Sequence, residues 1–208
     1  QLARNATYSF NSTFASSSTA IAPTITDTGN SSIAVTVGTG SEQEAFNLSV
    51  TSTTTLDELA TQFNASAEKA VASVVNKGTS AAPSYALVFS SLYEGSEKGT
   101  ISATVGTDIT TAGIFSTTTV SQAQDAQFSV SGVSGTITRS SNSISDVFNG
   151  LTFQLEKTGT TTIAVSDDAD ATASSMQEFV DTYNDIVEYI RENNIITREE
   201  DGEEVTNT

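Results

Sequence analysis

The side chains that could take part in acid–base chemistry in this sequence are carboxylates, because histidine and cysteine are both absent. Two neighbouring acids can serve as a general acid and a general base, and the candidates are Asp57 with Glu58 and Glu42 with Glu44. Both pairs occupy capping or surface positions, and no residues that would line a pocket accompany them. The G-x-S-x-G, P-loop and G-x-G-x-x-G motifs are also missing. We therefore predict that the chain is not an enzyme and binds no cofactor.

Three aspartates in the segment Asp167-Asp168-Ala169-Asp170 offer oxygen atoms of the kind that bind calcium. The segment lacks the glycine and the distal glutamate of an EF-hand loop. Acidic residues in front of a helix also stabilise its N-terminus through the helix dipole. We therefore interpret the segment as a helix start and predict no metal site, with calcium binding as the alternative.

The composition limits the classes of partner. The 208 residues carry a net charge of −17, which would repel nucleic acid phosphates and an anionic membrane surface. No stretch of about 18 apolar residues is present, so we expect no transmembrane helix. Without cysteine there is no disulfide framework, and the fold must depend on its core. The chain begins Gln1-Leu2-Ala3, with neither methionine nor signal peptide, so we expect a fragment of a longer protein.

The first half of the chain has the alternating pattern of short β-strands, with one short helix among them. Alternation and turn residues predict a hairpin of residues 33–37 and 45–50. Thr55 and Glu58 form a capping box, which predicts the start of a helix. Further strands are predicted at 71–75, 85–90 and 101–105. The Thr- and Gly-rich segment 108–121 is expected to be a linker between two lobes.

The second half continues with strands. Alternating segments predict strands at 127–131, 136–138 and 151–155, and at Ile163 and Val165. Ser143 followed by Asp146 predicts a helix of one or two turns that ends at Gly150.

A long helix is expected to begin at Ser174 or Ser175, where Ser175 and Glu178 form another capping box. Its apolar residues recur at heptad-like spacing. They form what we call the apolar stripe: Met176, Phe179, Val180, Tyr183, Ile186, Val187 and Ile190. The stripe needs a partner, because a lone helix of this length is marginal in water. It packs either against a helix of its own polypeptide that lies outside these 208 residues or against another subunit. The acidic segment 198–204 is expected to be solvated and disordered.

Several of these segments follow one another in the order of a known family pattern. They are Ala126–Val133 (AQFSVSGV), Arg139–Asp146 (RSSNSISD), Gly150–Leu155 (GLTFQL) and Phe179–Asn184 (FVDTYN). In order and spacing they resemble the bacterial flagellar filament-capping proteins, the hook-associated protein 2 family. The first half fits this family more loosely, and Phe63-Asn64 stands where Ile-Asn is usual.

The strand pattern and the resemblance together predict an α+β fold that is mainly β. Two β-rich head lobes with short helices would be followed by the start of a helical leg. One lobe is expected to comprise residues 1–21 and 112–170, as the family's second domain. The other, residues 22–111, would be inserted into it as the family's third domain. Residues 171–208 would form the start of the leg and the acidic tail.

The resemblance implies a structural cap at the distal end of the flagellar filament, extracellular at the flagellum tip. There it would self-assemble and promote flagellin folding and polymerisation. The implied partners are copies of itself in a ring-like homo-oligomer, flagellin, and the hook–filament junction proteins, with no nucleic acid and no membrane. The family's terminal coiled-coil segments are missing from this sequence, so we predict a monomer or weak oligomer in dilute solution.

Two other functions stay open at this point. Ser/Thr-rich β lobes are also common in bacterial surface adhesins and other secreted binding modules, and flagellin or hook-junction relatives have β-rich outer domains. An adhesin module would bury the C-terminal helix on its own lobe, whereas a cap would extend it away from the sheets.

Overall fold

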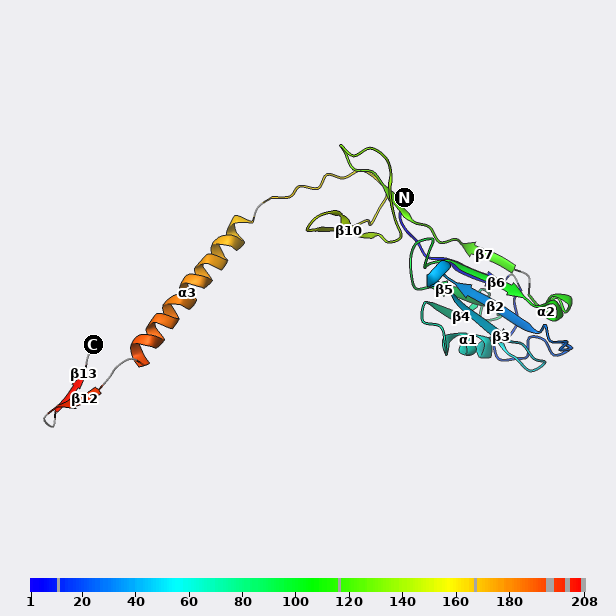
Figure 1. Ribbon diagram of the computed structural model, residues 1–208. Helices are drawn as coiled ribbons and strands as arrows, with labels where there is room; N and C mark the ends of the chain where they lie inside the picture. The colour runs from blue at the N-terminus through cyan, green and yellow to red at the C-terminus, as the bar shows by residue number, and fades with distance from the viewer. Residues whose placement is uncertain (11, 116, 167, 194–196, 201–202, 207–208) are drawn as a thin grey trace. The chain divides into compact units, whose positions relative to one another are not determined.

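The computed structural model describes residues 1–10, 12–115, 117–166, 168–193, 197–200 and 203–206. The chain divides into two compact units, Gln1–Gly159 and Thr160–Thr208, and each is described by itself (Figure 1). Several small sheets and few helices make up the fold, and the predicted α+β, mainly β class is confirmed. Among the residues described, no helix combines the length and apolarity needed to cross a bilayer.

The elements have the following bounds. The strands of the first unit are β1 (Thr7–Phe10), β2 (Ser32–Val37), β3 (Glu44–Ser49), β4 (Ala70–Asn76), β5 (Tyr85–Ser91), β6 (Ile101–Val105), β7 (Thr117–Ser121), β8 (Ala126–Phe128), β9 (Ile137–Arg139), β10 (Ser143–Phe148) and β11 (Leu151–Gln154). Its helices are the 3-10 helix η1 (Gly40–Glu42), α1 (Leu56–Asn64) and α2 (Thr107–Thr111). The second unit contains α3 (Ala169–Asn193), β12 (Thr197–Glu200) and β13 (Glu203–Thr206).

Two sheets and α1 enclose the core of the first unit. One sheet has the order β4-β5-β1-β7 and the other the order β3-β2-β6. Every second residue of β2 is fully buried, as its alternation predicts. Phe63 of α1 joins the sheets, because its ring centroid lies 4.8 Å from that of Phe46 on β3 and 4.9 Å from that of Phe89 on β5.

The predicted capping box at the start of α1 is present. The Thr55 side chain accepts from the backbone N–H of Glu58 at 3.1 Å, and the Glu58 carboxylate accepts from the backbone N–H of Thr55 at 3.0 Å. These bonds satisfy N–H groups that the first helical turn leaves without partners. They fix the start of the helix that carries Leu56, Leu59 and Phe63 into the core.

Replacing Thr55 with alanine is therefore expected to lower the free energy of unfolding by about 1 kcal/mol, the usual effect of losing such a cap. Urea denaturation followed by circular dichroism measures this change. Thr55→Ser retains the hydroxyl and should unfold near the original urea concentration. Equal losses in the two variants would contradict a capping role for the hydroxyl.

Residues 108–121 are not the linker that their composition predicts. They contain α2 and β7, and Ile109 on α2 is fully buried. The Asp108 carboxylate accepts hydrogen bonds from the Thr28 backbone N–H (2.8 Å), the Thr28 hydroxyl (2.6 Å) and the Ser31 hydroxyl (2.9 Å). The prediction was wrong because β-branched threonine also suits a strand, and because the apolar side chain of Ile109 carries α2 into the core.

The hydrogen bonds from Thr28, above all the one from its hydroxyl, lower the pKa of Asp108 from 3.8 to about 2. A carboxyl whose pKa is lower in the folded state stabilises the fold above its unfolded pKa. That contribution disappears as the pH falls through the folded pKa. Asp108→Asn should therefore lower the melting temperature at pH 5 to 7, and the difference from the original chain should shrink between pH 4 and pH 2. Calorimetry across this range measures it, and a pH-independent difference would contradict the assignment.

The sheet topology crosses the lobe boundary that the sequence suggests. β1 and β7 lie in one sheet with β4 and β5, and β1 pairs directly with both β5 and β7. The ring centroid of Phe10 lies 4.4 Å from the ring centroid of Phe115 and 6.2 Å from that of Phe89. Residues on both sides of the expected boundary thus share one core, because alternation predicts strands but not their neighbours. Assigning these parts to the family's second and third domains stays a prediction.

The rest of the first unit consists of two hairpins, β8–β9 and β10–β11. Residues 143–148 form β10, so the short helix predicted from Ser143 and Asp146 was wrong. Ile144 is buried opposite Phe153, and Phe148 pairs with Leu151 across Asn149-Gly150. An Asn-Gly dipeptide is a strong hairpin signal, and Gly150 has φ 77°, which such a turn requires.

The second unit corrects two predictions about elements. Ile163 and Val165 were predicted to lie in a strand, but they lie in a segment without regular structure, and no described strand pairs with them. Both side chains are exposed. α3 begins at Ala169, earlier than Ser174, because the Asp168 carboxylate accepts from the backbone N–H of Ala171 at 2.8 Å.

The acidic tail also differs from the prediction of disorder. β12 and β13 pair as an antiparallel hairpin in which Thr197 lies opposite Thr206 and Glu200 opposite Glu203. Asp201 and Gly202, which also belong to the predicted tail, lie outside the described residues.

Candidate interaction surface on the C-terminal helix

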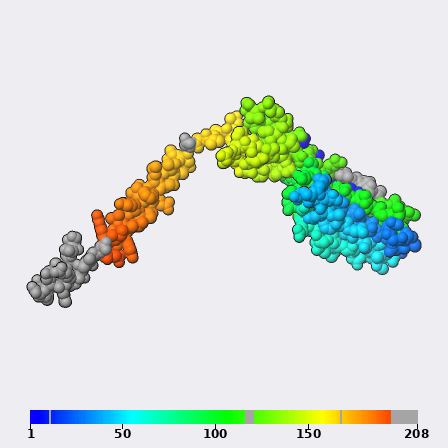
Figure 2. Space-filling model, viewed as in Figure 1, coloured from blue at the N-terminus to red at the C-terminus, as the bar shows by residue number. Residues whose placement is uncertain are grey.

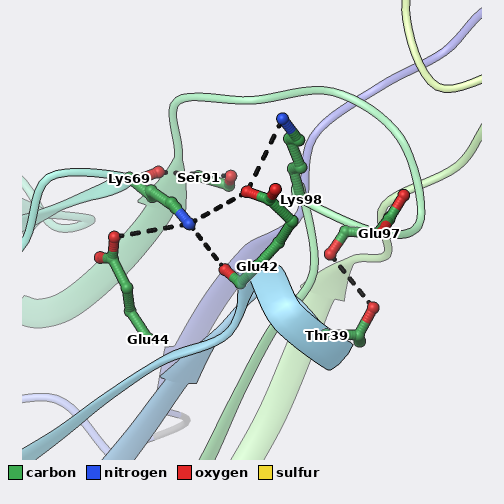
Figure 3. Close-up of polar contacts among 7 residues, drawn as sticks. All are labelled: Thr39, Glu42, Glu44, Lys69, Ser91, Glu97 and Lys98. Atoms are coloured by element: carbon green, nitrogen blue, oxygen red, sulfur yellow. Dashed lines mark hydrogen bonds and ion pairs between the residues drawn. The ribbon is translucent and has the colours of Figure 1, made fainter.

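Glu42 and Glu44, one of the two carboxylate pairs considered for acid–base chemistry, have structural partners. Glu42 Oε2 lies 3.2 Å from Lys69 Nζ and 3.6 Å from Lys98 Nζ, and Glu44 Oε1 lies 3.7 Å from Lys69 Nζ (Figure 3). The hydrogen bond from Lys69 is the main cause that lowers the pKa of Glu42. Lys69 also donates to the backbone carbonyl of Glu42 at 2.8 Å. This cluster ties η1 to the residue that precedes β4.

The other acidic candidates stand at helix starts. Glu58 completes the capping box of α1, with Asp57 beside it in the first turn. Asp168 caps α3, and Asp170 lies in the first turn of that helix; Asp167 lies outside the described residues. In the part of the chain that the structure describes, no three acidic, histidine or cysteine side chains are grouped as a metal site requires.

The apolar stripe lies on the surface of α3. Figure 2 shows the helix in space-filling form, coloured orange, and none of its residues is buried. Six stripe residues are between 47% and 73% exposed, and Val187 is half-buried. Tyr189 was not predicted as part of the stripe, and it is 67% exposed. Large apolar side chains exposed together on one helix mark a surface that a partner covers.

The rest of the helix is acidic and internally bonded. The helix contains one basic residue, Arg191, and six acidic residues: Asp170, Glu178, Asp181, Asp185, Glu188 and Glu192. Gln177 donates to Asp181 at 2.9 Å, and the Thr182 hydroxyl donates to the Glu178 carbonyl at 2.8 Å. A partner helix with an apolar face and basic residues beside it would complement this surface.

Asn142, in the family-like segment Arg139–Asp146, has a structural role that the sequence analysis did not predict. Asn142 is only 7% exposed. Its side chain accepts from the Ala3 N–H at 2.8 Å and donates to the Ala3 carbonyl at 2.9 Å and to Glu94 Oε1 at 2.8 Å. Its backbone N–H donates to Glu94 Oε2 at 3.0 Å. Asn142 therefore joins the chain start and the loop after β5 to the β10–β11 hairpin.

Neighbouring residues of the same pattern support this junction. Arg139 Nε lies 2.9 and 2.8 Å from the two carboxylate oxygens of Asp146, and this hydrogen bond lowers the pKa of Asp146. A side chain added at Gly95, which has φ 84°, would bring its Cβ into a clash with the Ser140 carbonyl oxygen. The loop after β5 thus approaches β9 and β10 closely at a position that suits glycine.

Comparisons with known proteins agree with these features. Residues 123–208 match the model of the flagellar hook-associated protein 2 C-terminus. The flagellar hook-associated protein 2 of Campylobacter jejuni is 38% identical over 68 residues, which is 33% of this chain and 10% of that protein. The protein of the same description from Helicobacter pylori is 37% identical over 78 residues, 36% of this chain and 11% of that protein. The matched segments thus span about a tenth of these relatives.

The fold has a counterpart in a solved structure. The D1-D2-D3 domains of the Escherichia coli flagellar cap protein FliD superpose with a TM-score of 0.71 at 23% identity. The superposition covers 92% of this chain and 64% of that one, so the fold likeness extends across both units while the sequence match lies in the C-terminal part. The sequence match over residues 123–208 and the shared fold show that this chain is similar to the flagellar hook-associated protein 2 family.

Proposed function

We propose that this chain is the head and the start of the leg of a filament cap, a structural protein without catalytic activity at the distal, extracellular end of the bacterial flagellar filament. The observation that carries the proposal is the exposed apolar stripe of α3, on a chain with the family's sequence pattern. A surface of this kind suits assembly, and three of the acidic candidates for chemistry, Glu42, Glu44 and Glu58, are engaged in ion pairs or a helix cap.

The cap would work by confinement and complementary contacts. Several copies would form a ring in which the β-rich heads make a lid and the helical legs hold open a space beneath it. Newly exported flagellin would fold and join the filament in that space. Besides copies of itself and flagellin, the partners would include the hook–filament junction proteins that are present before the filament grows.

The stripe would mainly hold the leg together. We propose that most of it packs against a helix of the same polypeptide that lies outside these 208 residues. Part of the helix surface would lie near a neighbouring subunit. The six carboxylates on α3 favour a helix with basic flanks as the partner. The match of residues 123–208 to the flagellar hook-associated protein 2 C-terminus favours a cap over an adhesin module.

Deleting the gene in the source bacterium tests the proposal. We expect the mutant to release unpolymerised flagellin into the medium and to lack filaments, and a plasmid copy should restore them. Electron microscopy and immunoblotting of the medium measure both effects. Normal filaments in the mutant would overturn the proposal.

A further inference from the structure

The outer edge of β4 is an open sheet edge in the first unit. β4 is the end strand of the order β4-β5-β1-β7, and all seven of its residues pair with β5 in regular register. Figure 1 shows α1 beside this strand. Among the described residues, no strand pairs with its other side.

One side chain occupies the centre of that edge. Asn64, the last residue of α1, donates from Nδ2 to the Ala72 carbonyl at 2.9 Å and accepts at Oδ1 from the Ala72 N–H at 2.8 Å. This is the bond pair that a neighbouring strand would make. Since backbone groups alternate in direction along a strand, those of Val74 and Asn76 point the same way as those of Ala72.

The other usual protections of an edge strand are missing from β4. Its sequence, Ala-Val-Ala-Ser-Val-Val-Asn, contains no charged residue, no proline and no glycine. Val71 and Val75 are 36% and 41% exposed. A regular, uncharged, apolar edge is a template for pairing with another strand. The amide of Asn64 is therefore the feature that interrupts this template.

We propose that the outer edge of β4 is a latent strand-pairing surface that Asn64 keeps closed. When this edge is open, its partner is the β4 edge of a second copy of this chain. A second copy fits for two reasons. The strand is itself extended, uncharged and rich in β-branched residues, so it matches its own edge. β4 also carries no charge, so pairing of two copies along this edge places no like charges opposite each other.

The test is the concentration dependence of the mass of the 208-residue chain. We expect Asn64→Ala to raise the weight-average mass toward that of a dimer in sedimentation equilibrium, beyond any association of the original chain. The matched control is Thr61→Ala, which removes a side-chain bond to the Asp57 carbonyl within the same helix and should leave the mass unchanged. Adding Ser73→Lys to Asn64→Ala places a charge on the exposed side of β4 and should restore the original mass.

An Asn64→Ala chain that stays folded and has the mass of the original chain at every concentration would overturn the proposal, as would association that Ser73→Lys does not reduce. If Asn64→Ala fails to fold, amide exchange in the original chain decides the question. We expect a protected Ala72 amide and fast exchange at Val74 and Asn76. Equal protection of all three amides would show that the edge is not open and would overturn the proposal.

Discussion

Replacing Asn142 with alanine is expected to lower the free energy of unfolding of the β-rich unit by about 3 kcal/mol. The reason is that one side chain serves two distant segments. Without it, the N–H and carbonyl of Ala3 and one oxygen of Glu94 lose their partners. Ala3 is 4% exposed, so its backbone groups have little access to water as a substitute, and unsatisfied buried groups are more costly than the bonds themselves.

Urea denaturation with a fluorescence probe would measure this loss. The matched control is Ser140→Ala, an exposed neighbour in the same sequence motif, which should change the stability by less than about 0.5 kcal/mol. Asn142→Asp keeps the shape but places a second carboxylate beside Glu94, so it should be at least as destabilising as alanine. Equal unfolding midpoints for Asn142→Ala and Ser140→Ala would contradict the junction role.

Alternation, capping residues and heptad spacing predicted the elements that depend on residues close together in the sequence. The hairpin of β2 and β3 was predicted from alternation. The start of α1 was predicted from the capping box, which is formed within the four-residue segment from Thr55 to Glu58. The exposed stripe on α3 follows from heptad spacing. In each case the residues that interact lie within a few positions of one another, or share one face of a single element.

Other features depended on contacts between distant residues, which periodicity does not contain. Asn142 bonds to Ala3, 139 positions away, and Asp108 bonds to Thr28, 80 positions away. The sequence motif around Asn142 was recognisable, but its role was visible only once the two segments were placed together. The same holds for the sheet that joins β1 and β7 to β4 and β5.

Two errors came from competing local signals. Ser143 and Asp146 have the spacing of a helix cap, but Asn149-Gly150 specifies a hairpin. As part of β10, Ile144 is buried and lies opposite Phe153 on β11. The acidic residues after α3 suggested a solvated tail, but residues 197–200 and 203–206 pair as two antiparallel strands. At residues 143–148, turn chemistry prevailed over the capping pattern.

Introducing aspartate at both Phe179 and Ile186 in the full-length protein is expected to abolish filament growth while the head stays folded. This prediction depends on the proposed function. Both side chains are exposed on α3, at 73% and 53%, so their loss removes nothing from the core. A partner helix that buries both would lose about 4 kcal/mol of apolar contact, which corresponds to about a thousandfold weaker association.

The decisive comparison separates assembly from folding. The double variant should leave the melting temperature of the 208-residue chain within about 2 °C of the original, since the substitutions lie outside the first unit. Motility in soft agar and electron microscopy of the cells report on assembly. Glu178→Gln, on the same helix but outside the stripe, should grow normal filaments. If the double variant also grows normal filaments, the apolar face of α3 is not an assembly surface, and the exposed side chains need another explanation.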